Sequence, residues 1–126
     1  QQVAYLTPIS EDALGELLAE SLGESRVSLA TPRVAQPTSL AVVSISDGIP
    51  SYAFHRNGTA ERQVTKQNLH RDMPAETQLF HVGSLGLIEG ADADTWEEFF
   101  RDCQRQRRLC GAPAPDDASR RYLQAQ

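Results

Sequence analysis

The chain has 126 residues, of which 40% are hydrophobic and 23% charged, and its formal net charge is −5. This length predicts one domain with a modest core, and the composition is typical of a soluble globular protein rather than a disordered tail. The acidic balance argues against a nucleic-acid-binding surface, and no apolar run reaches the roughly 18 residues of a membrane-spanning helix. Because the N-terminus also lacks the pattern of a secretory signal, we expect a cytoplasmic protein that contacts neither nucleic acid nor membrane.

The N-terminal third predicts a strand, a helix and an extended segment. Residues 2–6 are expected to form a short strand, and residues 11–22 a helix with Ser10 as its N-cap and Gly23 as its C-terminal stop. Leucines and alanines recur in this helix at helical spacing, which predicts one buried face. The proline-containing segment Val27–Pro37 is expected to be extended.

A three-stranded meander is predicted over residues 39–46, 50–56 and 60–64. Asp-Gly at 47–48 and Asn-Gly at 57–58 are strong signals for tight turns, because both central residues of such a turn adopt positive φ. The first strand is apolar on both faces. This pattern predicts that the domain itself, or a partner, covers both sides of the strand.

The C-terminal half predicts one helical turn at 66–69, a buried strand at 78–82 and a helix over about 93–109. Residues 118–126 could add a short helix, after a loop over Gly111–Pro115. The long helix has an apolar stripe at helical spacing. Its expected buried face consists of Trp96, Phe99, Phe100 and Cys103.

The second strand of the meander carries the best candidate for a ligand contact. Side chains alternate along a strand, so Arg56 falls on the same face as Tyr52 and Phe54. A guanidinium beside an aromatic face offers a rigid fork of donors to hydroxyl or carboxylate oxygens. The competing interpretation makes Arg56 a solvated surface cation and Phe54 a core residue. His55 falls on the opposite face, which predicts a dimer or surface residue rather than a base.

No segment of the sequence predicts a catalytic, cofactor or metal site. The phosphate-binding pattern Gly-x-x-x-x-Gly-Lys-Ser/Thr does not occur, and no His or Cys set has metal-ligand spacing. Ser84 lacks the glycine-flanked elbow of a serine hydrolase. Cys103 and Cys110 are expected to be buried structural thiols, and His81 a hydrogen-bonded core histidine.

Several segments, in a fixed order, carry a family resemblance. They are Val-Ala-Tyr-Leu at 3–6, Ser-Glu-Asp-Ala-Leu-Gly at 10–15, Pro-Thr-Ser-Leu-Ala-Val-Val-Ser at 37–44, Phe-His-Arg-Asn-Gly-Thr-Ala-Glu at 54–61 and His-Val-Gly-Ser-Leu at 81–85. In order and separation they resemble the fructokinase branch of the ribokinase-like (PfkB) carbohydrate kinases. The resemblance covers most of the chain and runs through the middle portion of such a kinase.

The resemblance implies an α/β fold of the ribokinase-like type, with a partial α/β core and a β-sheet lid. Residues 1–30 and 70–126 would form the partial core, and residues 31–69 the lid, which is the three-stranded meander. In many members of the family, lid strands cover the sugar and also form the dimer contact. The expected architecture is therefore part of a kinase core with its lid attached.

Carried over residue by residue, the resemblance places Arg56, Phe54 and Ala41 where related kinases hold a sugar or sugar acid. The Gly-Ala-Gly-Asp segment, with the family's catalytic aspartate and anion hole, does not occur in this sequence. The Asp-Pro-Asn-x-Arg motif is replaced by the segment 110–117. We therefore expect no catalytic residue in this chain, and neither ATP nor Mg²⁺ to bind it alone.

The function implied is that of a portion of an ATP-dependent sugar kinase, which phosphorylates a hydroxyl of fructose or of a related ketose or sugar acid. ATP and Mg²⁺ would serve the complete enzyme, and the 126-residue chain alone would be inactive. The alternative is a non-catalytic β-lid module that pairs two chains into a homodimer. The two interpretations are compatible, because a kinase lid can also be a dimer contact.

Overall fold

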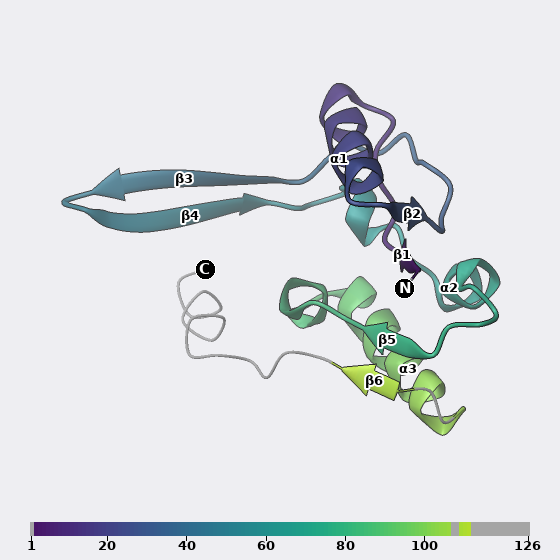
Figure 1. Ribbon diagram of the computed structural model, residues 1–126. Helices are drawn as coiled ribbons and strands as arrows, with labels where there is room; N and C mark the ends of the chain where they lie inside the picture. Colours follow the sequence, from purple (N-terminus) through teal and green to yellow (C-terminus); the bar gives the residue numbers. More distant parts are fainter. Residues whose placement is uncertain (1, 107–108, 112–126) are drawn as a thin grey trace. The chain divides into compact units, whose positions relative to one another are not determined.

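The computed structural model describes residues 2–106 and 109–111, and the chain divides into two compact units, Gln1–Gln63 and Val64–Gln126. Each unit contains two parallel strands joined through a helix (Figure 1). Parallel neighbours need such a crossover connection, so each unit is built around a βαβ motif. The α/β class predicted from the sequence is confirmed.

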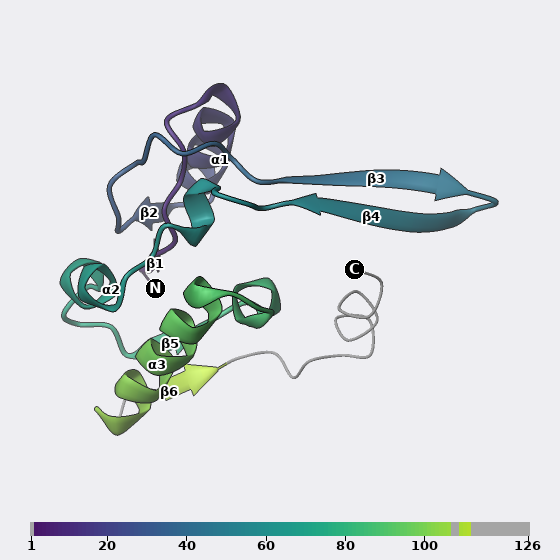
Figure 2. The same cartoon turned by 180° about the vertical axis from the view of Figure 1, so that it is seen from behind.

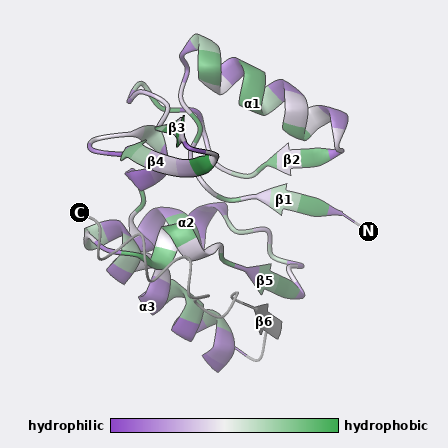
Figure 3. Ribbon diagram, turned by 90° about the vertical axis from the view of Figure 1, so that its left-hand side faces the viewer, coloured by the Kyte–Doolittle hydropathy of each residue, from purple (hydrophilic) through white to green (hydrophobic). Residues whose placement is uncertain are grey.

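The first unit begins with strand β1 (Val3–Tyr5), helix α1 (Ala13–Glu24) and strand β2 (Val27–Leu29). β1 and β2 pair in parallel, and hydrophobic residues dominate both strands in Figure 3. Arg26 adopts φ 58° in the tight connection between α1 and β2. The strand and helix predicted here are confirmed, while β2 occupies only the start of the segment predicted to be extended.

Two details of the helix prediction are wrong. Gly23 lies inside α1 rather than stopping it, and the predicted buried face is exposed, since Leu14, Leu17 and Leu18 are 44%, 61% and 48% exposed and only Gly15 of this helix is buried.

Helix α1 is capped by Asp12, not by Ser10 as the sequence predicted. The Asp12 carboxylate accepts a hydrogen bond from the backbone N–H of Gly15 at 2.7 Å. Ser10 lies two residues before the cap, and its hydroxyl accepts a hydrogen bond from the backbone N–H of Asp12 at 3.0 Å. Both residue types can cap a helix, so local propensity could not separate them.

Strands β3 (Leu40–Ser46) and β4 (Ile49–His55) form an antiparallel hairpin. Its two-residue turn places Asp47 at φ 51° and Gly48 at φ 77°. Two consecutive positive φ values define the type of turn that matches the twist of a hairpin. The first turn of the predicted meander is therefore confirmed, and the strands run side by side along their length in both views (Figures 1 and 2).

The prediction of a third strand in the meander is wrong. In its place stands a short 3₁₀ helix, η1 (Ala60–Arg62). The hydroxyl of Thr59 donates to the carbonyl of Arg56 at 2.7 Å, and the N–H of Ala60 donates to the carbonyl of Pro37 at 2.8 Å. The Thr59 bond is a local side-chain bond that competes with strand pairing, and the long-range Ala60 bond turns the chain back toward the start of β3.

Both faces of the hairpin are exposed in the part of the chain that the structure describes. Every residue of β3 is exposed, and so is every residue of β4 except Phe54, which is half-buried. The sequence predicted that either the domain itself or a partner covers both faces of the first strand. Among the described residues, none of the chain's own segments covers them. One side, here named the apolar hairpin face, carries Ala41, Val43, Ile45, Pro50, Tyr52 and Phe54.

The second unit comprises helix α2 (Lys66–Asp72), strand β5 (Leu79–His81), the 3₁₀ helix η2 (Ser84–Leu87), helix α3 (Ala91–Arg105) and strand β6 (Leu109–Gly111). β5 and β6 pair in parallel, with α3 in the connection between them. The predicted turn at the start of α2 extends into a full short helix. The predicted strand at β5 is confirmed.

Three predictions for this unit need correction. Helix α3 ends at Arg105 rather than at 109, and β6 occupies residues that the sequence assigned to the helix end and a loop. A strand of this length has no periodicity of its own and is defined only by its pairing with β5. His81 is exposed, not a core residue, because β5 buries only its central residue, Phe80. The predicted short helix at 118–126 lies outside the described residues.

An aromatic cluster forms the core of the second unit. Phe99 is fully buried, and its ring meets that of Phe80 edge-on with centroids 5.3 Å apart. Trp96 and Cys103 of α3 are also buried, which confirms most of the predicted buried face, while Phe100 is half-buried. Edge-to-face ring pairs add to the stabilisation that burial of their area provides. The side chain of Cys110 lies outside the described residues.

Candidate functional site

The residues that open and close the β3–β4 hairpin form a connected polar group. We name this group the hairpin base, and define it as Thr38, Ser39, Arg56, Thr59 and Glu61. Thr38 and Ser39 precede β3, Arg56 follows β4, and the other two lie at and in η1. The chain therefore returns to the start of the hairpin directly after leaving it.

Glu61 joins the two ends of the hairpin. One carboxylate oxygen, Oε1, lies 2.6 Å from Nε of Arg56, and the other, Oε2, accepts a hydrogen bond from the hydroxyl of Ser39. The Arg56 and Glu61 side chains are only 16% and 27% exposed. Charge-assisted hydrogen bonds of this kind are stronger than neutral ones. Arg56 is therefore an anchored, largely buried guanidinium, and its interpretation as a solvated surface cation is wrong.

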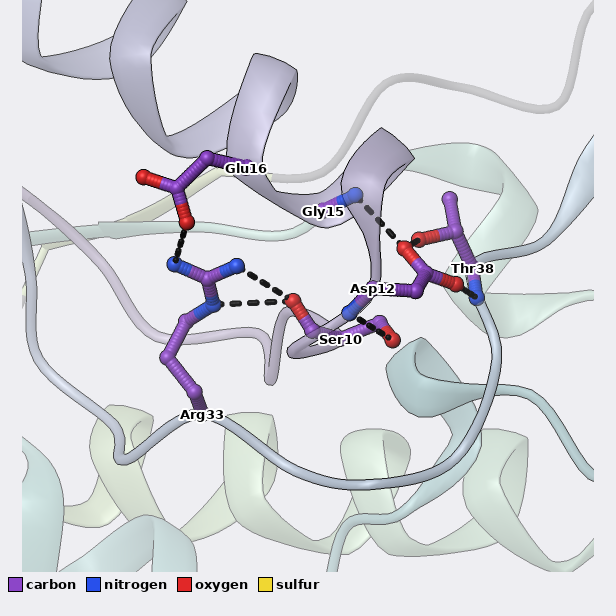
Figure 4. Close-up of polar contacts among 6 residues, drawn as sticks. All are labelled: Ser10, Asp12, Gly15, Glu16, Arg33 and Thr38. Atoms are coloured by element: carbon purple, nitrogen blue, oxygen red, sulfur yellow. Dashed lines mark hydrogen bonds and ion pairs between the residues drawn. The ribbon is translucent and has the colours of Figure 1, made fainter.

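A second anchor connects the hairpin base to helix α1 (Figure 4). Asp12 Oδ1 accepts from the Thr38 hydroxyl at 2.6 Å, and Oδ2 accepts from the Thr38 backbone N–H at 2.8 Å. Since Oδ1 also caps the helix, one carboxylate fixes both the start of α1 and the segment entering β3. These donors, with the Thr38 hydroxyl first, hold the pKa of Asp12 well below its ordinary value.

The loop before α1 is held by Arg33. Its Nε and one terminal nitrogen donate to the carbonyl of Ser10 at 2.8 and 2.6 Å, and the other terminal nitrogen lies 3.2 Å from the Glu16 carboxylate (Figure 4). A Cβ placed on Gly15 would lie 1.9 Å from that same carbonyl oxygen. Only glycine allows the helix to approach the loop so closely. Asp12 and Arg33 therefore serve structure in the first unit.

The three residues predicted to contact substrate lie close together along the hairpin. Ala41 and Phe54 are direct cross-strand partners on the apolar hairpin face, and Arg56 follows β4 two residues beyond Phe54. The rings of Tyr52 and Phe54 stack, with centroids 6.3 Å apart and planes 11° apart. An aromatic face next to an oriented guanidinium suits a ligand with both C–H and hydroxyl surfaces.

Sequence reasoning did not identify the partners of Arg56. The sequence patterns place Ser39 and Glu61 in two of the predicted strands and indicate no contact of either residue with Arg56. A signal was nevertheless present, because an acidic residue five positions after an arginine, beyond a Gly-containing turn, can fold back onto it. The contact with Ser39, 22 residues away, had no local signal.

A charged cluster in the second unit links α2 to α3. The carboxylate of Asp102 lies 3.0 Å from Nζ of Lys66 and 3.1 Å from Nε2 of His70, and it also pairs with Arg105. The His70 ring stands edge-on to Phe99 with centroids 4.8 Å apart. The Lys66 ammonium, followed by His70, lowers the pKa of Asp102 to about 2. Both carboxylate oxygens of Asp102 therefore pair with basic side chains, and the pairs with Lys66 and His70 connect α3 to α2.

Within residues 2–106 and 109–111, no three His, Cys, Asp or Glu side chains converge as a metal site would require. In the same part of the chain, none of the helices has both the length and the hydropathy to cross a bilayer.

Comparison with known proteins places this arrangement in a class. A crystal structure of fructokinase from Xylella fastidiosa superposes with a TM-score of 0.82 at 20% identity, over 97% of this chain and 39% of that one. The same enzyme with bound ATP gives 0.80 at 20% identity, over 96% and 38%. Fructokinase from Vibrio cholerae O395 in a fructose, ADP and calcium ion bound form gives 0.63 at 16% identity, over 88% and 36%. The fold is that of the ribokinase-like sugar kinases.

The sequence comparison is more specific. Fructokinase from Rhizobium leguminosarum bv. trifolii is 35% identical over 98 residues, which are 75% of this chain and 29% of that protein. No protein-family model matches the chain. The chain belongs to the PfkB carbohydrate kinases, on their fructokinase branch. It spans less than a third of the length of the Rhizobium relative.

Proposed function

We propose that this chain forms part of an ATP-dependent sugar kinase of the fructokinase type, which transfers a phosphoryl group to a sugar hydroxyl. The observation that carries the proposal is the 35% identity to the Rhizobium fructokinase over 98 residues. The ATP-bound Xylella structure and the fructose- and ADP-bound Vibrio structure support ATP as donor and fructose as acceptor. A related ketose or sugar acid is the alternative acceptor that the family resemblance leaves open, and Mg²⁺ is the metal we expect beside the phosphates.

Arg56, Phe54 and Ala41 are the proposed sugar contacts. Arg56 is held by Glu61 at Nε, and a guanidinium is a donor group suited to hydroxyl oxygens. Phe54 offers an apolar ring to the C–H side of a sugar, and Ala41 opposite it leaves room because its side chain is small. The three residues thus supply polar and apolar contacts from one hairpin.

In this proposal the hairpin is a lid, and the βαβ motifs belong to the core. The sequence-based division assigns residues 1–30 and 70–126 to the core and 31–69 to the lid. The lid then consists of β3, β4 and the turns that follow, since the third predicted strand is a 3₁₀ helix. The catalytic base and the phosphate-binding amides are proposed to lie outside these residues.

The proposal is tested by assaying ATP-dependent phosphorylation of fructose. The natural protein in which this sequence occurs should turn over fructose, and the 126-residue chain alone should be inert. Absence of activity in the natural protein, with ATP and Mg²⁺ present, would refute a kinase. Turnover by the chain alone would refute the placement of the catalytic residues elsewhere.

A second candidate function is association of two chains through the hairpin. The apolar hairpin face favours it, since Val43, Ile45 and Tyr52 are 51%, 75% and 40% exposed. Exposed, contiguous apolar surface commonly marks an interface. We propose a homodimer in which this face is covered, compatible with a lid function. A cytoplasmic location, predicted from the sequence, is part of the same proposal.

A further inference from the structure

The Glu61 carboxylate bonds both ends of the hairpin, through Arg56 after β4 and Ser39 before β3. Ser39 follows Thr38, which Asp12 fixes through two hydrogen bonds of 2.6 and 2.8 Å. Glu61 is therefore supported from the helix side as well as from the hairpin side. Such support restricts the rotamers of a long side chain.

The contact uses a particular edge of the guanidinium. Glu61 Oε1 lies 2.6 Å from Nε of Arg56, the donor nearest the side-chain stem. A guanidinium is planar with donors at fixed angles, so a partner at Nε sets the direction in which the other donors point. Glu61 consequently constrains the orientation of Arg56 before any ligand arrives.

The contact also changes the charge that a ligand meets. With side chains only 16% and 27% exposed, the Arg56–Glu61 pair is partly shielded from water and salt. A ligand near Arg56 therefore meets a neutral pair of opposite charges rather than an isolated cation. A carboxylate ligand would lie within a few ångströms of the Glu61 carboxylate, and like charges at that range repel.

We propose that Glu61 is a positioning residue that sets the direction and the effective charge of Arg56, and so makes the hairpin select uncharged sugars over sugar acids. The inference rests on the proposed function, in which Arg56 contacts the sugar. An uncharged hydroxyl accepts from an oriented guanidinium without repulsion from Glu61. An acid would be bound well only by an arginine whose charge is not offset.

The test is the ratio of kcat/KM for fructose to that for 2-keto-3-deoxygluconate, a sugar acid, measured with the natural protein. Glu61→Gln keeps an oxygen acceptor for the Nε–H but removes the negative charge. The ratio should fall by about tenfold, mainly because KM for the acid decreases, as expected for loss of one nearby like charge. Equal losses for both substrates, or an unchanged ratio, would overturn the inference.

Glu16→Gln is the matched control. It removes the carboxylate of another Arg–Glu pair of the first unit, but Glu16 is 62% exposed and lies in α1. For this variant, the ratio of kcat/KM for fructose to that for the acid should stay within about twofold of the wild-type value, because an exposed ion pair contributes little electrostatic energy. A ratio that falls as far as in Glu61→Gln would overturn the specific role of Glu61.

Two further measurements cover the remaining outcomes. If Glu61→Gln does not fold, the wild-type dissociation constants decide, and fructose should bind about tenfold or more tightly than the acid. Equal or tighter binding of the acid would overturn the inference. If the wild-type protein phosphorylates neither substrate, the proposed function fails; if it phosphorylates fructose but the ratio is insensitive to Glu61, only this inference fails.

Discussion

The carboxylate of Asp12 accepts hydrogen bonds from both the hydroxyl and the backbone N–H of Thr38, at 2.6 and 2.8 Å. The two residues lie 26 positions apart in the chain. The same carboxylate caps α1 through Gly15. The start of a core helix and the entry to the hairpin are therefore fixed by one side chain. Any movement of the hairpin entry must disturb the helix cap.

Thr38→Val should raise the pKa of Asp12 toward its ordinary value. The substitution keeps the side-chain shape but removes the hydroxyl that contributes most to lowering this pKa. The carboxyl ¹³C signal of Asp12, followed by NMR during acid titration, measures the change. Thr95→Val is the control, because Thr95 bonds a helix carbonyl of α3 and not a carboxylate. An Asp12 titration unaltered by Thr38→Val would contradict the hydrogen-bonding account.

Gly15→Ala should destabilise the first unit by about 1–3 kcal/mol, the typical range for overpacking. The new Cβ would lie 1.9 Å from the carbonyl oxygen of Ser10. Urea unfolding followed by circular dichroism measures the free energy of unfolding.

Gly23→Ala provides the matched control within α1. A Cβ there meets nothing within 4 Å, so alanine should stabilise the helix by about 0.5–1 kcal/mol. Opposite signs for the two substitutions are expected. Equal effects would mean that the close approach of α1 to the Ser10 loop is not present in solution.

Acid should lower the free energy of unfolding of the second unit, because protonation of Asp102 removes its ion pairs. The pKa of Asp102 is lowered to about 2 by Lys66 and His70, so its contribution is complete above the ordinary value near 3.8. That contribution is lost as the pH falls from about 4 through about 2. The free energy of unfolding, measured over this window, should fall more steeply for the wild type than for Asp102→Asn. Parallel curves would contradict the clamp between α2 and α3.

Val43→Lys should abolish a dimer formed through the apolar hairpin face. Val43 lies on that face opposite Tyr52, whereas its neighbour Ser44 points to the other side opposite Ser51. A lysine on the covered face would bury an unpaired charge, which is strongly unfavourable. Sedimentation equilibrium should show a monomer for Val43→Lys and a dimer for Ser44→Lys. A wild-type monomer, or a dimer that tolerates both lysines, would contradict this association surface.

Turn chemistry explains which part of the hairpin was predictable. Asp47-Gly48 has the local conformational preference for two positive φ values, and these are observed. Asn-Gly at 57–58 has the same local preference, yet only Gly58 has positive φ there. The contacts of Ala60 with Pro37 and of Glu61 with Ser39 turn the chain into a 3₁₀ helix instead. Those contacts join residues more than 20 positions apart, which local patterns do not encode.

The candidate site was predictable in its residues but not in its geometry. Alternation along β4 placed Phe54 on the face of Tyr52, and the stacked rings confirm it. The sequence did not indicate that Arg56 would be held by Glu61, nor that Asp12 would connect α1 to Thr38. The choice of Asp12 over Ser10 as the helix cap likewise depends on Thr38, a residue from another segment. Hydrogen bonds between distant segments therefore determine the helix cap and the partners of Arg56, which local propensity does not predict.

The KM for fructose of Arg56→Ala, measured in the natural protein that contains this chain, tests the central claim that the hairpin contacts the sugar. Loss of a charged donor to a substrate hydroxyl should raise KM about 10- to 100-fold. Arg101→Ala, which removes a 65% exposed arginine of α3, should leave KM unchanged. A KM for Arg56→Ala equal to that of the wild type, in a folded protein, would contradict the account.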